Sequence, residues 1–286
     1  MNITLSNTHL QLTISEHGAE IQSLKNKHTG IEYIWNGDPT YWPRHAPILF
    51  PMAGPTKDSE ISVNWVCYPM PNNGFARDLD WKLESHDEDS ATFVLEDSEE
   101  SLKFYPFGFK LTTTYTLGDD TVSVKTTVES KSDELRFIYA LHPAFMLGMN
   151  QDAKAEDYMI SFSSDEHLDR LIKNGPLFQP AGKLEGKLMK LTREDLDTGA
   201  ITLKNLDSKK VSLLCGVGNH GVEITLGDLH TLVVWSPEGK KAPFVCVEPM
   251  LSFGDTSRPK ELKDMEGLLR LNKGQKKTFV NEIRPF

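Results

Sequence analysis

Two titratable residues stand at the ends of apolar, strand-like runs. His142 lies in FIYALHPAF, directly before Pro143, and Glu248 ends the run PFVCVE. A histidine titrates near neutral pH and can act as a general acid or base. A carboxylate that ends a buried strand costs free energy unless it is paired or solvated, and burial raises its pKa toward neutrality. Together, the two side chains could move protons on a bound substrate.

Each candidate residue also has a structural interpretation. Taken alone, a histidine such as His142 is more often a structural residue that bonds a neighbouring loop. Glu248 could be a surface carboxylate before a proline turn, although a charge rarely ends an apolar run by accident. Arg44, in RHAPILFPMAG, could donate to sugar hydroxyls or to an anion, or could form a surface salt bridge.

A third segment, PNNGFARDLDW, contains a strong turn signal at Asn73–Gly74. It could be only the tip of a hairpin, or it could be a loop that holds a ligand. Arg77 in this segment could bind substrate, or it could lock the loop by pairing with Asp78 or Asp80. We favour the structural role for Arg77 slightly.

The elements that must position these residues read mostly as β-strands. Alternation of polar and apolar residues, punctuated by turn residues, is typical of an antiparallel sandwich or barrel. It recurs in the segments 3–15, 90–98, 109–118, 121–130, 200–249 and 276–286. We expect short helices at 166–174 and 259–269, and one domain that spans residues 1–286.

Composition narrows the class of protein. The chain has 286 residues, of which 38% are hydrophobic and 25% charged, and this suits a soluble globular protein with a large core. The formal net charge of −10 argues against a nucleic-acid partner, because phosphate binding needs a basic face. The sequence does not predict an oligomeric state.

The cysteines and the N-terminus indicate a compartment. Cys67, Cys215 and Cys246 are odd in number and lack the spacing of a zinc site, so a reducing compartment fits better than a disulfide framework. The start of the chain lacks the pattern of a signal peptide, and no apolar run has membrane-spanning length. We expect a cytoplasmic protein without a membrane segment.

Taken together and in order, several segments resemble the aldose 1-epimerase (galactose mutarotase-like) family, and most of all its LacX-like branch. They are GAEIQSLKNKHTGIEYIWNGDPTYW, APILFPMAG, NGFAR, LHPAF and VCVEPMLSFGD. The resemblance covers nearly the whole chain. It implies an all-β fold, a large and mostly antiparallel β-sandwich with a few short helices and a sugar-binding cleft across one sheet.

The resemblance also implies an activity, the interconversion of the α and β anomers of a sugar without cofactor or metal. Glu248 matches the family's general base, which takes the proton of the anomeric hydroxyl. His142 matches the general acid, which protonates the ring oxygen. The ring then opens, the C1–C2 bond rotates, and closure occurs on the other face. Arg44, Asn73 and Arg77 fall at expected substrate-binding positions.

Three positions depart from the family pattern. Asn73 stands where the family usually has a histidine that donates to the sugar, Pro55 where it often has arginine, and Met250 where it often has tryptophan. Loss of one preorganised donor costs about 2.7–4 kcal/mol of transition-state stabilisation. The sequence is therefore compatible with a weakened epimerase or with a silent sugar-binding protein. A phosphorylated sugar fits if Arg44 and Arg77 both point into the cleft.

Overall fold

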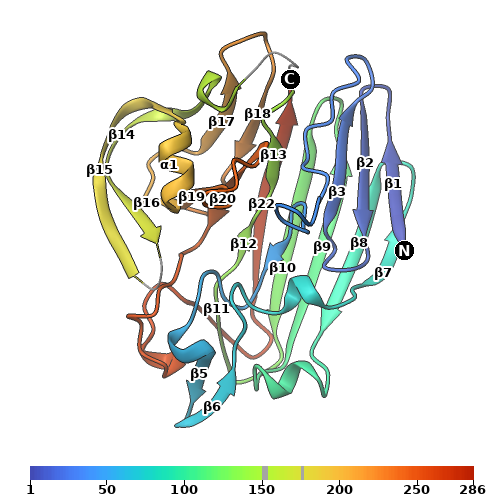
Figure 1. Ribbon diagram of the computed structural model, residues 1–286. Helices are drawn as coiled ribbons and strands as arrows, with labels where there is room; N and C mark the ends of the chain where they lie inside the picture. The colour runs from blue at the N-terminus through green and yellow to red at the C-terminus, as the bar shows by residue number, and fades with distance from the viewer. Residues whose placement is uncertain (150–153, 175–176) are drawn as a thin grey trace.

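The structure is a computed structural model that describes residues 1–149, 154–174 and 177–286. Within these ranges the chain is mainly β-structure, and every ladder between the named strands is antiparallel (Figure 1). The all-β, mostly antiparallel fold class expected from the sequence is confirmed.

One large sheet provides the frame, with fifteen strands among the described residues. In spatial order its path is β4 (Ile48–Leu49), β12 (Ala140–Leu141), β20 (Phe244–Met250), β19 (Thr231–Trp235), β16 (Ala200–Lys204), β14 (Tyr158–Asn174), β17 (Lys210–Cys215), β18 (Gly221–Thr225), β22 (Lys276–Pro285), β10 (Val122–Ser130), β9 (Phe109–Leu117), β8 (Ser90–Glu96) and β7 (Lys82–His86). Off this path, β13 (Ala144–Met146) pairs with β20 and β15 (Leu177–Lys190) pairs with β14.

Smaller sheets flank this frame. They comprise β1 (Asn2–Ser6), β2 (Leu10–Ser15) and β3 (Ile21–Asn26), then β5 (Glu60–Val63) with β6 (Val66–Pro69), and β11 (Glu134–Phe137) with β21 (Leu269–Asn272). Figure 1 shows β1–β3 lying over the β7–β10 part of the large sheet. The Tyr115 hydroxyl donates to the Ala19 carbonyl at 2.5 Å and ties the two layers together. The apolar core fills the space between them, because alternate residues of β9 and β10 are buried.

Helices are short in the described residues. The structure has α1 (Arg193–Thr198) and the single 3-10 turns η1 (Lys57–Ser59), η2 (Ala76–Asp78), η3 (Ser101–Lys103), η4 (Ala155–Asp157) and η5 (Leu262–Asp264). No helix among the described residues is long and apolar enough to cross a membrane.

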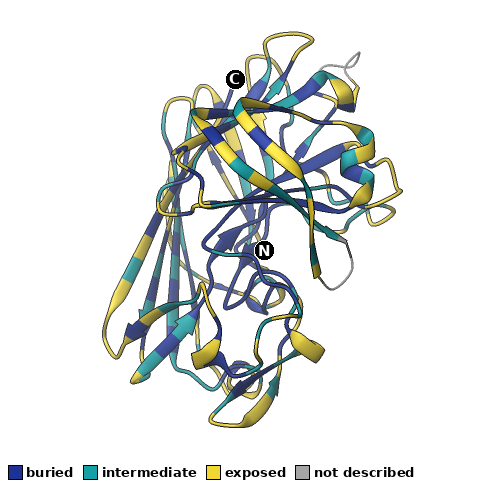
Figure 2. Cartoon of the chain, turned by 90° about the vertical axis from the view of Figure 1, so that its left-hand side faces the viewer, coloured by how far each residue is buried: buried dark blue, intermediate teal, exposed yellow. Residues whose placement is uncertain are grey.

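The helix expected at 166–174 is wrong, because this segment belongs to strand β14. Leu168, Leu171 and Ile172 have helical spacing, but β14 has partner strands on both sides. The ladder hydrogen bonds from those partners outweigh a weak local propensity. Figure 2 shows the resulting β14–β15 hairpin facing the viewer, largely exposed along its outer strand.

The helix expected at 259–269 is reduced to the single turn η5. Its neighbour Glu261 accepts hydrogen bonds from the Ser62 hydroxyl and from the backbone N–H groups of Asn64 and Trp65. Ser62 also donates its backbone N–H to the Lys260 carbonyl. These contacts with the β5–β6 hairpin hold the segment extended where a helix would begin.

Candidate active site

Strand register places His142 directly opposite Glu248. Ala140 pairs with Met250, and Ala144 pairs with Cys246. Residues 142 and 248 lie halfway between these two pairs on their respective segments, so the same register places them opposite each other. Pro143 interrupts the ladder at this point because it lacks an N–H donor. The backbone N–H of His142 instead donates to the Pro47 carbonyl at 3.0 Å. Two segments more than a hundred residues apart thus present their titratable groups side by side.

The two side chains meet in a buried environment. His142 Nε2 lies 3.3 Å from Glu248 Oε2, and both residues are buried. Burial raises the pKa of Glu248 well above its usual range, and the charge of Arg77 opposes that shift only in part. Burial, with the positive charges of Arg77 and Arg44, lowers the pKa of His142 to about 3. Burial thus favours the uncharged form of each group, the carboxylic acid of Glu248 and the neutral imidazole of His142.

Each member of the pair keeps an unpartnered polar atom. His142 Nδ1 and Glu248 Oε1 are buried and have no hydrogen-bond partner in the described part of the chain. Buried polar groups normally find partners, and exceptions are frequent at functional sites. The imidazole ring stacks on Trp42 with centroids 5.0 Å apart and meets the edge of Trp235 at 5.9 Å. The aromatic rings fix the orientation of the histidine.

A cavity of about 560 Å³ opens above this pair. Its volume falls within the range of small-molecule sites. The lining residues come from several strands and loops that are distant in sequence. They are Trp42, Arg44, Pro55, Asn72, Asn73, Arg77, His142, Lys173, Ala200, Val233, Trp235, Glu238, Glu248, Phe253 and Thr256.

The segment PNNGFARDLDW forms one wall of the cavity, and it is not a hairpin tip. Asn73 and Gly74 both have positive φ, at 68° and 70°. A Cβ on Gly74 would lie 2.2 Å from the Phe50 carbonyl oxygen, so only glycine fits this close approach. Asn73 Oδ1 accepts the Gly54 N–H at 2.7 Å, which leaves the amide nitrogen end of the side chain as the possible donor to a ligand.

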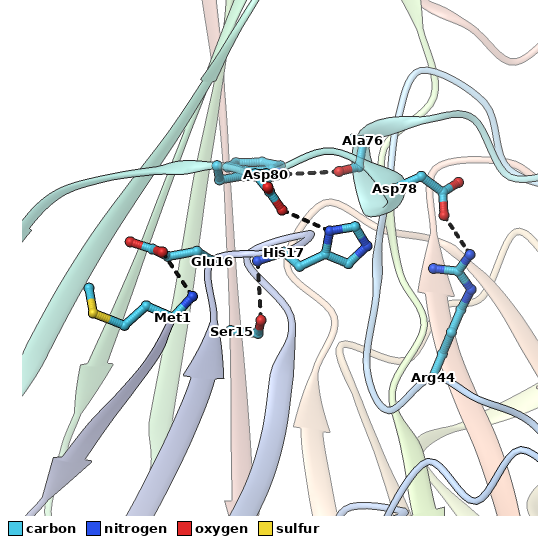
Figure 3. Close-up of polar contacts among 9 residues, drawn as sticks. Met1, Ser15, Glu16, His17, Arg44, Ala76, Asp78 and Asp80 are labelled. Carbon is cyan, nitrogen blue, oxygen red and sulfur yellow. Dashed lines mark hydrogen bonds and ion pairs between the residues drawn. The ribbon is translucent and has the colours of Figure 1, made fainter.

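Two arginines reach the cavity from neighbouring segments and share one carboxylate. Arg44 pairs with Asp78 at 2.5 Å, as Figure 3 shows, and the Nε of Arg77 lies 3.8 Å from the same side chain. Arg77 also donates to the Asn72 carbonyl at 2.8 Å. Asp80 instead pairs with His17. Both arginines thus pair within the loop and also line the cavity. The structural role expected for Arg77 does not exclude contact with a ligand.

The structure brings all five predicted site residues to one cavity: Arg44, Asn73, Arg77, His142 and Glu248. Of the three departures from the family pattern, Asn73 and Pro55 line the cavity. Met250 is fully buried between Ala140 and Thr231 in the sheet, and it is not among the residues that line this cavity. Position 250 thus belongs to the packed interior of the sheet and not to the cavity wall.

Sequence reasoning missed several lining residues. Trp42 belongs to an aromatic-rich segment whose rings are more often core than ligand-facing, and Trp35 in that segment is indeed buried in a small cluster with Phe244. Trp235, Ala200 and Lys173 also line the cavity. Trp235 and Ala200 lie at the ends of segments that the sequence predicts as strands, but which strands are neighbours was not visible. Lys173 was missed because it lies within segment 166–174, for which the sequence predicts a helix.

His142 and Glu248 lie close to Cys246, and the three side chains are of types that can bind a metal ion. One ligand atom from each of His142, Cys246 and Glu248 lies within 4.8 Å of the others. Burial raises the pKa of the Cys246 thiol well above its usual value, and the nearby Glu248 adds to this. A thiol must lose its proton to bind a metal, so the environment works against metal binding.

Comparisons with known proteins agree with this architecture. The sequence profile described as Aldose 1-epimerase matches residues 1–283. The chromosomal LacX protein of Lactococcus lactis is 31% identical over an alignment of 268 residues, and the match covers 87% of this chain and 87% of that protein.

Two solved structures are similar over the full length. A galactose mutarotase-related enzyme from Lactobacillus acidophilus has a TM-score of 0.95 at 29% identity and covers 100% of this chain and 97% of its own. A galactose mutarotase-like protein from Lactobacillus casei has a TM-score of 0.92 at 33% identity, with 100% of both chains covered. With the profile match across the chain, these likenesses show that the protein belongs to the aldose 1-epimerase family.

Proposed function

We propose that this protein is an aldose 1-epimerase that interconverts the α and β anomers of a hexose or related sugar. The observation that carries the proposal is the buried His142–Glu248 pair at the floor of the cavity, with one unpartnered atom on each side chain. Family membership supports the same reaction class.

The geometry of the pair suits the chemistry. The anomeric hydroxyl and the ring oxygen are bonded to the same carbon, so an acid and a base must act very close together. Nε2 of His142 and Oε2 of Glu248 are 3.3 Å apart, which lets one side chain reach each oxygen. The Glu248 carboxylate would take the hydroxyl proton, and the His142 imidazolium would protonate the ring oxygen. The C1–O5 bond then breaks and an aldehyde forms.

The reactive ion pair and the resting neutral pair contain the same number of protons. Transfer of one proton from Glu248 to His142 converts one form into the other. Sugar hydroxyls that donate to the carboxylate favour its charged form and so favour this transfer. After ring opening, rotation about C1–C2 presents the other face of the aldehyde, and the two residues exchange roles for closure.

The main alternative is a sugar-binding protein without catalysis, supported by Asn73 at the position of the family histidine. Asn73 can donate through its amide but cannot carry a proton between groups. The phosphorylated-sugar candidate is supported by Arg44 and Arg77 in the cavity lining. Asp78 offsets part of their charge, so we favour a neutral sugar.

Saturation-transfer NMR tests the proposal on glucose, galactose and glucose 6-phosphate. The proposal expects anomer exchange above the uncatalysed background for at least one neutral sugar. Isothermal calorimetry on the same samples identifies the alternative, which requires specific binding without exchange. Exchange confined to glucose 6-phosphate would establish the phosphosugar candidate instead.

A further inference from the structure

The floor of the cavity extends well beyond the catalytic pair. It crosses four adjacent strands in the order β20, β19, β16 and β14. Glu248 pairs with Val233 at the inner end, and Ala200 pairs with Lys173 at the outer end. All four of these residues line the same cavity. Three strand spacings of about 4.8 Å give a floor of about 14 Å.

A single hexose does not fill such a floor. With C–C bonds of about 1.5 Å, a pyranose ring and its hydroxyls span about 6 Å. When C1 lies at the His142–Glu248 pair, the ring covers β20 and β19. The part of the cavity over β16 and β14 then remains for another group of similar size.

The walls of this outer part combine aromatic and polar side chains. Trp235 of β19 lines the cavity, and its Nε1 donates to Glu238 Oε1 at 3.3 Å. Phe253 also lines the cavity, and its ring makes a T-shaped contact with Phe178, with ring centroids 5.8 Å apart. Ala200 lies between Trp235 and Lys173, where its short side chain leaves space. Aromatic faces with a few polar groups suit the apolar faces and hydroxyls of a sugar ring.

The charge of the outer part favours a neutral group. Burial lowers the pKa of Lys173, and the negative charges of Asp255 and Glu238 oppose that shift. Nearby carboxylates therefore offset part of the positive charge of Lys173. A phosphate placed there would meet the Glu238 carboxylate as well as the Lys173 ammonium group, whereas hydroxyls can donate to the former and accept from the latter.

We infer that the outer half of this cavity is a subsite for a second sugar ring, so that the preferred substrate is the reducing end of a neutral disaccharide. This inference rests on the proposed epimerase function. It assigns Ala200, Lys173, Trp235 and Phe253 to substrate selection.

The test compares anomer exchange for glucose, maltose, cellobiose and glucose 6-phosphate with the wild-type protein. We expect kcat/KM for at least one of the two disaccharides to exceed that for glucose by about ten-fold, because the second ring adds contacts in a preformed site. If neither disaccharide exceeds glucose, or if glucose 6-phosphate exceeds both, the inference is overturned while the epimerase function stands.

Two substitutions test whether a preference for disaccharides arises in the part of the cavity over β16 and β14. Ala200→Leu fills the space between Trp235 and Lys173, and Lys173→Met removes a polar contact without a large change in volume. We expect each to lower the ratio of disaccharide to glucose kcat/KM by about ten-fold. Lys125→Met on strand β10, an exposed lysine outside the cavity, is the matched control and leaves the ratio unchanged. An unaltered ratio in Lys173→Met would contradict the inference even if Ala200→Leu failed to fold.

Calorimetry separates failure of the subsite from failure of the epimerase proposal. If no sugar shows exchange, the catalytic proposal fails, but the disaccharide should still bind about ten-fold more tightly than glucose. Equal affinity for glucose and for both disaccharides would count against the subsite, whatever the exchange measurements show.

Discussion

At the scale of single residues, the central feature is the buried contact between His142 and Glu248. Burial displaces the two pKa values in opposite directions, upward for the carboxyl group and downward for the imidazole. The pair titrates as a unit, so its macroscopic pKa values belong to both groups. In the proposed mechanism the reactive form holds one proton between the two groups.

This pairing predicts the pH dependence of kcat/KM. Addition of a second proton requires protonation of the imidazole, whose pKa is lowered to about 3, so the acid limb should lie well below the ordinary histidine value of 6.5. Loss of the last proton is governed by the raised Glu248 pKa, so the alkaline limb should lie well above 4.5. Anomer exchange measured across this range should be nearly flat between the limbs. Activity that falls through pH 6.5 on acidification would contradict the shared-proton account.

Asn73 offers a second prediction at this scale. Asn73→Ala removes both the contact with Gly54 N–H and the amide donor in the cavity, so kcat/KM should fall by about 10²–10³. Asn73→His should retain exchange, because imidazole can also donate to the sugar. Steady-state exchange rates measure both effects.

The control for this prediction is Asn26→Ala. Asn26 Oδ1 also accepts backbone N–H groups, from His28 and Thr29, in a turn outside the cavity. Its substitution should leave exchange unchanged. If Asn73→Ala matched this control, Asn73 would have no role in substrate binding.

At the scale of elements, the strand pattern was predictable and the partners were not. The hairpin β9–β10 and its connector at 118–120 were visible because alternation and turn residues are local signals. Segment 166–174 was misassigned because its apolar spacing suits a helix while strands on both sides hold it extended. Register decides which side chains meet, and it depends on residues far away in sequence.

A buried carboxylate on β14 holds this strand to the connection between β16 and β17, and its substitution tests the stability of β14. Glu166 is fully buried and accepts the backbone N–H groups of Asp207 and Ser208. Glu166→Ala leaves these donors unpaired and should lower the free energy of unfolding by about 1–3 kcal/mol. Urea unfolding followed by tryptophan fluorescence measures the change.

The matched control lies on the partner strand. Glu185 pairs with His167, but the pair is exposed to solvent, so Glu185→Ala should have little effect on stability. Equal destabilisation by both substitutions would show that the buried contacts of Glu166 have no special part in holding β14 to the connection between β16 and β17.

At the scale of the whole molecule, the site exists only because one continuous sheet aligns distant segments. The pair comes from β20 and from the connection between β12 and β13, and the walls come from the loops at 42–55 and 72–77. The resemblance of ordered motifs to one family predicted that these segments converge. It did not predict the aromatic walls or the outer half of the cavity, because Trp235, Ala200 and Lys173 meet only through strand order.

The most direct measurement of the central claim is anomer exchange by saturation-transfer NMR for wild type, Glu248→Gln and His142→Asn at neutral pH. Glu223→Gln, which replaces another strand glutamate outside the cavity, is the control. Because proton transfer by a positioned acid or base contributes about 10²–10⁴ in rate, each pair variant should lose at least 10²-fold while the control matches wild type. Exchange in Glu248→Gln equal to that of wild type would show that this carboxyl group is not the base and that the account is wrong.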